Sequence, residues 1–200
     1  MPDMRGDDRR NRILDAALAL LTSGGLEAVT TAALARESRC SKSTLYVLFA
    51  DRTAILSALV ARQADALNAA LDGIDGAMPP RDALAEAGAR LLDLLTSPAS
   101  LAINRAALAD ATGTLSRILV EAGRDRSAPK FLDLFRRLRA DGTVEFADEE
   151  EIYRCFYGLL IADRQILALH GVKEARPGRA ERRRIASQAV AATLRLHAPS

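Results

Sequence analysis

Apolar residues near the start of this chain recur at intervals of three and four, the period of an α-helix. They would form one stripe along a helix over residues 8–23, which Gly24 and Gly25 end, because glycine tolerates a left-handed C-terminal cap. The stripe consists of Ile13, Leu14, Ala17, Leu18 and Leu21. Such a stripe needs other helices to cover it.

Two short helices are predicted next, over residues 31–37 and 41–49. Thr30 or Thr31 would cap the first and Ser41 the second, since hydroxyl side chains accept hydrogen bonds from free backbone N–H groups. Only three residues separate the two helices. Two short helices joined this way and supported by a preceding helix form a helix-turn-helix, whose second helix enters the DNA major groove.

The rest of the chain also shows helical spacing, and no alternating pattern indicates a strand. Gly, Pro and capping residues divide it into further helices. They are expected over residues 51–72, 80–96, 99–110, 114–140 with a break near Pro129, 148–170 and 177–197. The fold class is therefore all-α, with about nine helices.

Composition narrows the range of functions. Hydrophobic residues make up 49% of the 200 residues but aromatic ones only 4%, so alanine and leucine dominate and favour helix. The net charge of +2 permits nucleic-acid binding without requiring it. Two isolated cysteines and two histidines provide neither a metal-ligand cluster nor a nucleophile with its base. We expect no metal, no cofactor and no enzyme activity, and a cytoplasmic protein.

A basic run, RRNR, precedes the apolar stretch ILDAALALL and superficially resembles a secretory signal. Asp15 interrupts that stretch and no small-residue cleavage site follows, so we expect a folded helix there. No segment has the run of apolar residues that a membrane span requires. A membrane is therefore not an expected partner.

The second helix of the motif has two different faces. Leu45 and Phe49 would anchor it, while Lys42, Ser43, Tyr46 and Val47 would point away from the module. A cation, a hydroxyl, an amphipathic aromatic ring and exposed methyl groups suit phosphate oxygens, base edges and thymine methyls. The alternative is that these are ordinary solvated residues on a small helical bundle.

The motif is more specific than a bare pattern. The run TTAALARESRCSKSTLYVLFADRTAIL, with the preceding ILDAALALLTSGGLEAVT, resembles the signature of the tetracycline-repressor (TetR) family. The resemblance covers about the first sixty residues, and beyond them only the pattern of helices. It implies a helix-turn-helix DNA-binding domain over residues 1–52 and a larger helical domain for effector binding and dimerisation over residues 53–200.

The resemblance also implies roles for single residues. The phosphate backbone would be held by Thr30 or Thr31, Ser41, Thr44, Tyr46 and Arg52. Lys42, Ser43 and Val47 would lie nearest the bases. Thr30 and Arg52 begin helices, where free N–H groups attract phosphate. Arg9, Arg10 and Arg12 would add contacts from the first helix.

The chain departs from the family pattern in the turn and at the base-facing positions. Arg39 stands where glycine is common, so a left-handed backbone would cost roughly 1 kcal/mol, while its charge offers a phosphate contact. Cys40 fills the usual small apolar position and is interpreted as a core residue rather than a redox sensor. Val47 and Leu48 replace polar and aromatic residues, so no operator sequence can be transferred. Through residue 52, basic residues exceed acidic ones by one.

A dimer is indicated by the stretch CFYGLLIA, residues 155–162, which is apolar nearly all round and needs cover on every side. One face would lie in its own domain, and a second copy would cover the other in a two-fold four-helix interface. The candidate interface residues are Cys155, Phe156, Leu159, Val190 and Leu194.

A pocket for a small-molecule effector is expected in the larger domain. Polar residues within apolar helix patterns are its candidate lining, because orienting a ligand takes few polar groups. They are Asn104, Arg105, Tyr157 and Arg164, each of which has the alternative of a hydrogen-bonded core or surface residue.

The function that fits these features is a repressor whose homodimer binds a palindromic operator and is released by an unknown small molecule. An enzyme built on the same bundle lacks any catalytic motif. The remaining alternative is a helical ligand-binding or interaction protein without DNA binding. The small excess of positive charge in the N-terminal region is consistent with this alternative.

Overall fold

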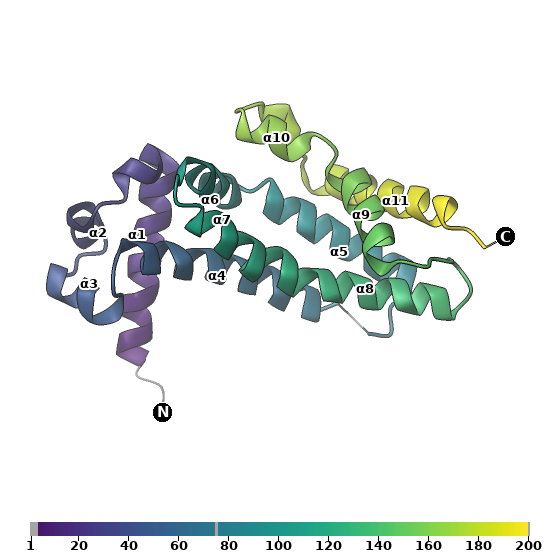
Figure 1. Ribbon diagram of the computed structural model, residues 1–200, viewed down its shortest axis with the longest axis horizontal. Helices are drawn as coiled ribbons and strands as arrows, with labels where there is room; N and C mark the ends of the chain where they lie inside the picture. Colours follow the sequence, from purple (N-terminus) through teal and green to yellow (C-terminus); the bar gives the residue numbers. More distant parts are fainter. Residues whose placement is uncertain (1–3, 75, 200) are drawn as a thin grey trace. The chain divides into compact units, whose positions relative to one another are not determined.

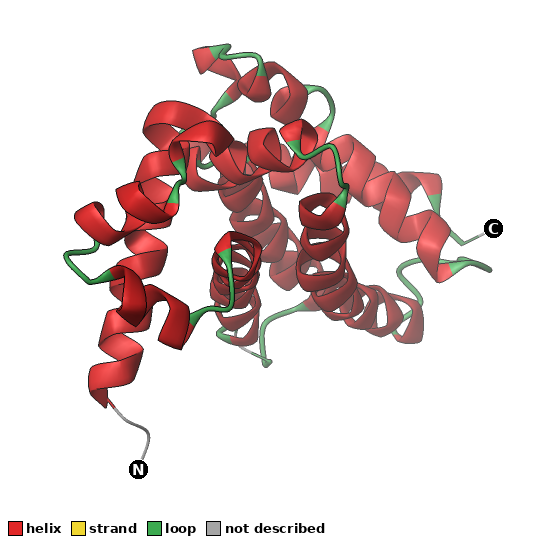
Figure 2. Ribbon diagram, turned by 60° about the vertical axis from the view of Figure 1, so that its left-hand side comes forward, coloured by secondary structure: helices red, strands yellow, loops and turns green. Residues whose placement is uncertain are grey.

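The computed structural model describes residues 4–74 and 76–199, which form helices joined by loops, with no strand among them (Figures 1 and 2). This confirms the all-α prediction. The described residues form eleven α-helical segments where about nine were expected, because two predicted helices are each interrupted. The segments are α1 (Met4–Ala28), α2 (Thr31–Glu37), α3 (Lys42–Leu48), α4 (Arg52–Asp72), α5 (Pro80–Leu95), α6 (Pro98–Ala109), α7 (Thr114–Leu119), α8 (Asp125–Ala140), α9 (Glu149–Ile161), α10 (Arg164–Leu169) and α11 (Arg179–Leu196).

The chain folds into two compact units. The first comprises the described residues through Gln63 and Pro98–Gly123, and the second comprises Ala64–Ser97 and the described residues from Arg124 onward. In the first unit α1 packs against α2 and α6, α2 against α3, and α6 against α7. Its core includes the predicted apolar stripe of α1 and the inward side chains of α2, α3 and the first half of α4.

The helix boundaries of the first unit follow local capping signals. Gly25 has a φ of 68°, which ends the regular part of α1 as predicted. The Thr30 hydroxyl accepts a hydrogen bond from the Ala33 amide at 3.1 Å. The Asp51 carboxylate accepts one from the Ala54 amide at 2.7 Å and caps α4. These contacts satisfy backbone donors that a helix N-terminus leaves free.

The second unit has an aromatic core. α5 packs against α8, α9 and α11, and α9 packs against α8 and α11. Phe131, Phe135 and Phe156 are fully buried, with the Phe135 and Phe156 rings edge to face at a centroid distance of 5.7 Å. Gly88 permits the close approach of the helices, because a Cβ atom there would lie 3.0 Å from Cζ of Phe156.

Three predicted boundaries in this part of the chain were wrong. The break expected near Pro129 lies upstream, as a π-helical turn over Val120–Arg124, and Pro129 lies close to the start of α8, where a missing amide donor is tolerated. The helix expected to reach His170 ends at Ile161, since Ala162 has a φ of 46°. The last helix begins two residues after Pro177, because Gly178 has extended backbone and occupies the N-cap position.

Within the described ranges, no single helix has the length and apolar content needed to cross a membrane. Among the described helices, one pair, Lys42–Leu48 and Arg52–Asp72, has that length and apolar content when the two are taken together, but a bend of 60° separates them.

Candidate nucleic-acid interface

The turn between α2 and α3 contains a residue with left-handed backbone. Arg39 has a φ of 53°, the left-handed conformation expected where glycine is common. The buried Ser38 hydroxyl donates to the Leu34 carbonyl at 2.6 Å, and the Cys40 amide donates to the Ala35 carbonyl at 3.0 Å. Cys40 is half-buried against the core of the first unit. The turn is therefore held by local hydrogen bonds despite the strained residue.

Helix α3 is anchored on one side and open on the other. Leu45 is 2% exposed and Phe49 is also buried, whereas Tyr46 is 58% and Val47 83% exposed. Lys42 and Ser43 are exposed as well. An aromatic ring and a branched aliphatic side chain that remain in solvent do not stabilise this unit's core. The four residues predicted to point away from the module do so.

A cluster of hydroxyl groups surrounds the start of α3. The Ser41 hydroxyl accepts a hydrogen bond from the Thr44 amide at 3.1 Å and caps the helix as predicted. It also lies 2.7 Å from the Ser43 hydroxyl and 2.8 Å from the Thr44 hydroxyl. Ser41 and Ser43 are exposed and Thr44 is half-buried. Hydroxyl hydrogens can turn outward, so the cluster can donate hydrogen bonds to an oxygen-rich surface.

Arg52 is placed differently from the phosphate contact expected of it. Its Nη2 atom donates a hydrogen bond to the backbone carbonyl of Leu26, and its Nε atom is buried without a hydrogen-bond partner among the described residues. The guanidinium thus joins the start of α4 to the end of α1 inside the unit. Thr30, by contrast, is exposed and Thr31 half-buried at the start of α2.

The four candidate pocket residues are not brought together by either unit. Asn104 donates from Nδ2 to the Ser100 carbonyl at 2.8 Å, and Arg105 is exposed on the same helix of the first unit. In the second unit the Tyr157 ring lies 6.1 Å from that of Tyr153. Arg164 donates to the Leu160 carbonyl at 3.4 Å. The contacts of Asn104, Tyr157 and Arg164 thus lie within their own helix or with an adjacent one, and no shared pocket is formed.

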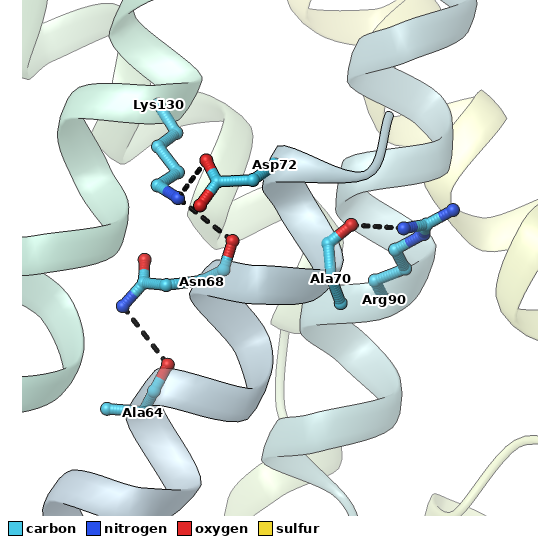
Figure 3. A network of polar contacts seen from close by, with 6 residues as sticks. All are labelled: Ala64, Asn68, Ala70, Asp72, Arg90 and Lys130. Carbon is cyan, nitrogen blue, oxygen red and sulfur yellow. Dashed lines mark hydrogen bonds and ion pairs between the residues drawn. The ribbon is translucent and has the colours of Figure 1, made fainter. Parts of the chain in front are cut away.

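The second unit has a cavity of about 380 Å³ between the end of α4, α5 and α8. Its apolar lining comprises Leu71, Ile74, Ala87, Pro129, Phe131 and Leu134. Lys130 at its edge pairs with Asp72 and donates to the Asn68 carbonyl at 2.9 Å (Figure 3). Sequence reasoning missed these residues, because no periodicity signals a contact between positions some sixty residues apart.

The candidate interface residues of α9 and α11 divide into two groups. Phe156 and Val190 are fully buried in the core of their own unit, so they are not available to a second copy. Cys155 and Leu194 are half-buried, and Leu159 is 40% exposed. A groove of about 460 Å³ beside Leu159 is lined by three alanines of α11, Ala189, Ala191 and Ala192, and by polar residues that include Arg164 and Arg195. One face of α9 and α11 therefore remains open.

Two family descriptions match most of the chain. Residues 13–59 match "Bacterial regulatory proteins, tetR family". Residues 82–199 match "AefR-like transcriptional repressor, C-terminal domain". The first match contains α2, α3 and the start of α4, and the second contains the aromatic core of the second unit.

The chain is also similar to individual proteins of the same family. A solved TetR transcriptional regulator from Agrobacterium tumefaciens shares 36% of its sequence over 94% of both chains, with a TM-score of 0.77. A TetR-family regulator structure from Mesorhizobium loti, 23% identical over 98% of this chain and 100% of its own, has the same fold, with a TM-score of 0.84. The HTH-type transcriptional repressor KstR of Mycolicibacterium smegmatis is 37% identical over 65 residues, about a third of either chain. The chain belongs to the TetR family of DNA-binding transcriptional regulators.

Proposed function

We propose that this protein is a repressor that inserts α3 into the DNA major groove. The observation that carries the proposal is the open face of α3, where Tyr46 and Val47 are exposed beside Lys42 while Leu45 fixes the helix from behind. A groove-entering helix needs this combination of a rigid anchor and free side chains. Its repressor role is supported by the KstR name and the AefR-like description.

The proposed contacts follow from position and chemistry. Lys42, Ser43 and Val47 face the bases, where Val47 offers methyl groups to thymine and Lys42 a cation to guanine. The hydroxyls of Thr30, Thr31, Ser41, Thr44 and Tyr46 hold phosphate oxygens. Arg39 is exposed on the turn that precedes α3 and adds a charged phosphate contact.

A homodimer and a palindromic operator complete the proposal. A single seven-residue helix reads few base pairs, so two copies on half-sites one helical turn apart give the specificity that one copy lacks. The open face of α9 and α11, with Leu159, Cys155 and Leu194, is the proposed surface between the copies. Its small alanine side chains allow helices to approach closely.

The effector is proposed to bind in the second unit, in the cavity between α4, α5 and α8. Mainly apolar walls with a few charged groups at the edge are typical of small-molecule sites. An effector releases DNA only by binding the DNA-bound and free conformations unequally. We propose that the protein is cytoplasmic, because a repressor must have access to DNA. We also propose that it acts by binding alone, without enzyme activity.

The test compares the affinities of wild-type protein, Lys42→Ala and Tyr46→Ala for a duplex that the wild type has selected from random-sequence DNA. Both substitutions should lower affinity at least tenfold, because Lys42→Ala removes a contact with the bases and Tyr46→Ala removes a contact with a phosphate. Lys173→Ala, which removes an exposed lysine from the second unit, is the charge-matched control and should bind as wild type does. Failure of the wild type to enrich any sequence at low salt would contradict the proposal and favour an interaction protein without DNA binding.

A further inference from the structure

The C-terminal end of α3 is held by a side chain from another helix. α3 spans only Lys42–Leu48, and Phe49 leaves it with extended backbone at φ −144° and ψ 130°. The last carbonyl groups of any helix lack partners within it, and a helix of two turns is marginal without tertiary contacts. The angle of α3 therefore depends on what its neighbours supply at this end.

Arg10 of α1 supplies two contacts there. Its Nη1 atom donates a hydrogen bond to the Leu48 carbonyl at 3.2 Å. Its guanidinium carbon lies 4.3 Å from the centroid of the Phe49 ring. A planar guanidinium can donate from its edge while its face stacks on an aromatic ring, and a positive charge is favourable at a helix C-terminus.

The position of Arg10 on α1 explains why this arginine reaches α3. Arg10 precedes Leu14 by four residues and Ala17 by seven, so it extends the buried stripe by one turn beyond the core. Arg9, Arg10 and Arg12 are all exposed, and Arg10 differs from the other two in its contacts with Leu48 and Phe49. The three arginines, which the sequence suggested as equivalent DNA contacts, are therefore in different situations.

We propose that Arg10 is a positioning residue that fixes the orientation of the recognition helix, rather than a phosphate contact. The inference rests on the proposed role of α3 in the groove. In the free protein Arg10 holds the Leu48–Phe49 end of α3 against α1. In the complex this contact keeps Lys42, Ser43 and Val47 in register with the base edges.

The salt dependence of DNA binding separates positioning from phosphate contact. Each phosphate contact contributes roughly 0.9 to the slope of log affinity against log salt concentration. Arg10→Ala should weaken binding to the selected duplex about tenfold, which corresponds to roughly 1.4 kcal/mol, with an unchanged slope and unchanged affinity for random-sequence DNA. A slope reduced by about 0.9 per subunit would overturn the proposal.

Arg10→Lys is the second variant. It retains the charge and loses the planar fork and the stacking surface, so it should bind as weakly as Arg10→Ala. Recovery of wild-type affinity would show that a point charge is sufficient, and would overturn the proposal. Arg117→Ala, at an exposed arginine of α7 to which no DNA contact is assigned, is the matched control, and thermal unfolding of every variant checks that the fold is intact.

A measurement without DNA keeps the inference independent of the proposed function. In amide hydrogen exchange of the free protein, Arg10→Ala should speed exchange across residues 45–49 and leave α6 unchanged, because only the end of α3 loses a contact. Arg9→Ala should leave both segments unchanged. Equal protection of residues 45–49 in Arg10→Ala and wild type would overturn the proposal, whatever the DNA experiments show.

Discussion

Arg52 at the start of α4 donates a hydrogen bond from its guanidinium to the backbone carbonyl of Leu26 at the end of α1. Arg62 in the next turns of α4 likewise pairs with Asp15 of α1, at 2.8 Å. With Arg10, three arginines of the first unit make contacts within it. Because basic residues exceed acidic ones by only one through residue 52, the charge left for DNA is small, and binding relies on placement of the exposed residues and on two copies.

The first prediction concerns Arg52→Met, which keeps most of the aliphatic stem and removes the guanidinium. The free energy of unfolding should fall by about 1–2 kcal/mol, since the Leu26 carbonyl loses a charged donor. DNA affinity measured at constant folded fraction should retain the wild-type salt slope. Chemical denaturation and titrations at several salt concentrations measure the two effects.

Arg117→Met, at an exposed arginine of α7, is the control for Arg52→Met and should leave stability within about 0.5 kcal/mol of wild type. Unchanged stability of Arg52→Met, together with a salt slope reduced by about 0.9 per subunit, would restore Arg52 as a phosphate contact.

The second prediction concerns the left-handed residue in the α2–α3 turn. Arg39→Gly should raise the free energy of unfolding by about 0.5–1 kcal/mol, because glycine adopts a φ of 53° without a Cβ clash. The same change should weaken DNA binding and reduce the salt slope by about 0.9 per subunit, since the exposed charge is lost. Stability and affinity should thus change in opposite directions.

Arg39→Ala separates these two effects, because it removes the charge and keeps the strained backbone. It should bind DNA as weakly as Arg39→Gly without the gain in stability. If Arg39→Gly were less stable than wild type, hydrogen bonds or packing by the arginine side chain would outweigh the strain.

The features that could be predicted from the sequence depend on neighbours within four residues. Thr30, Ser41 and Asp51 cap helices as expected, because a hydroxyl or carboxylate at a helix start bonds to an amide two or three residues on. The outward face of α3 follows from the period of 3.6 residues in the same way. Local chemistry therefore located the proposed recognition helix and its exposed side chains.

Features that depend on distant neighbours were missed. No glycine or proline follows Ile161 to mark the end of α9. Ala162 nevertheless has a φ of 46°, which ends the helix and which its residue type does not predict. Phe156 was predicted to face a partner because residues 155–162 are apolar on every side, and Val190 because its helix was expected to pack beside them, yet the core of their own unit covers both. The contact of Arg10 with Leu48 spans 38 positions, which no short-range pattern can show.

The third prediction is a high-pH transition. Burial raises the pKa of Tyr153 to about 12, with the neighbouring Tyr157 phenol contributing, and burial also raises the pKa of Tyr157. The unfolded value is about 10, so the folded state favours the neutral phenol and gains stability that is fully present below pH 10. This stability should be lost as the pH rises from about 10 through about 12.

Ultraviolet absorbance of tyrosinate in wild type and Tyr153→Phe measures this transition. The difference between the two proteins should titrate near pH 12, and the midpoint of chemical denaturation should fall over the same range. If the Tyr153 absorbance step came near pH 10, the phenol would be solvated and the burial around it would be incomplete.

The last prediction concerns the open face of α9 and α11. Leu159→Glu replaces an exposed leucine beside the groove of α11 by a carboxylate, where a second copy is proposed to pack. The substitution removes an apolar contact and requires a carboxylate to lose water in the interface, so the variant should be monomeric in sedimentation experiments at concentrations where the wild type is a dimer. Leu108→Glu, at a 75% exposed leucine of α6 in the first unit, is the matched control and should remain dimeric.

The monomeric Leu159→Glu variant should keep its helical content and lose most of its affinity for a palindromic duplex. It should bind a single half-site as weakly as one wild-type subunit would. If Leu159→Glu stayed dimeric and Leu108→Glu dissociated, the surface between copies would include α6 instead. The proposal that a second copy packs on the open face of α9 and α11 would then be wrong.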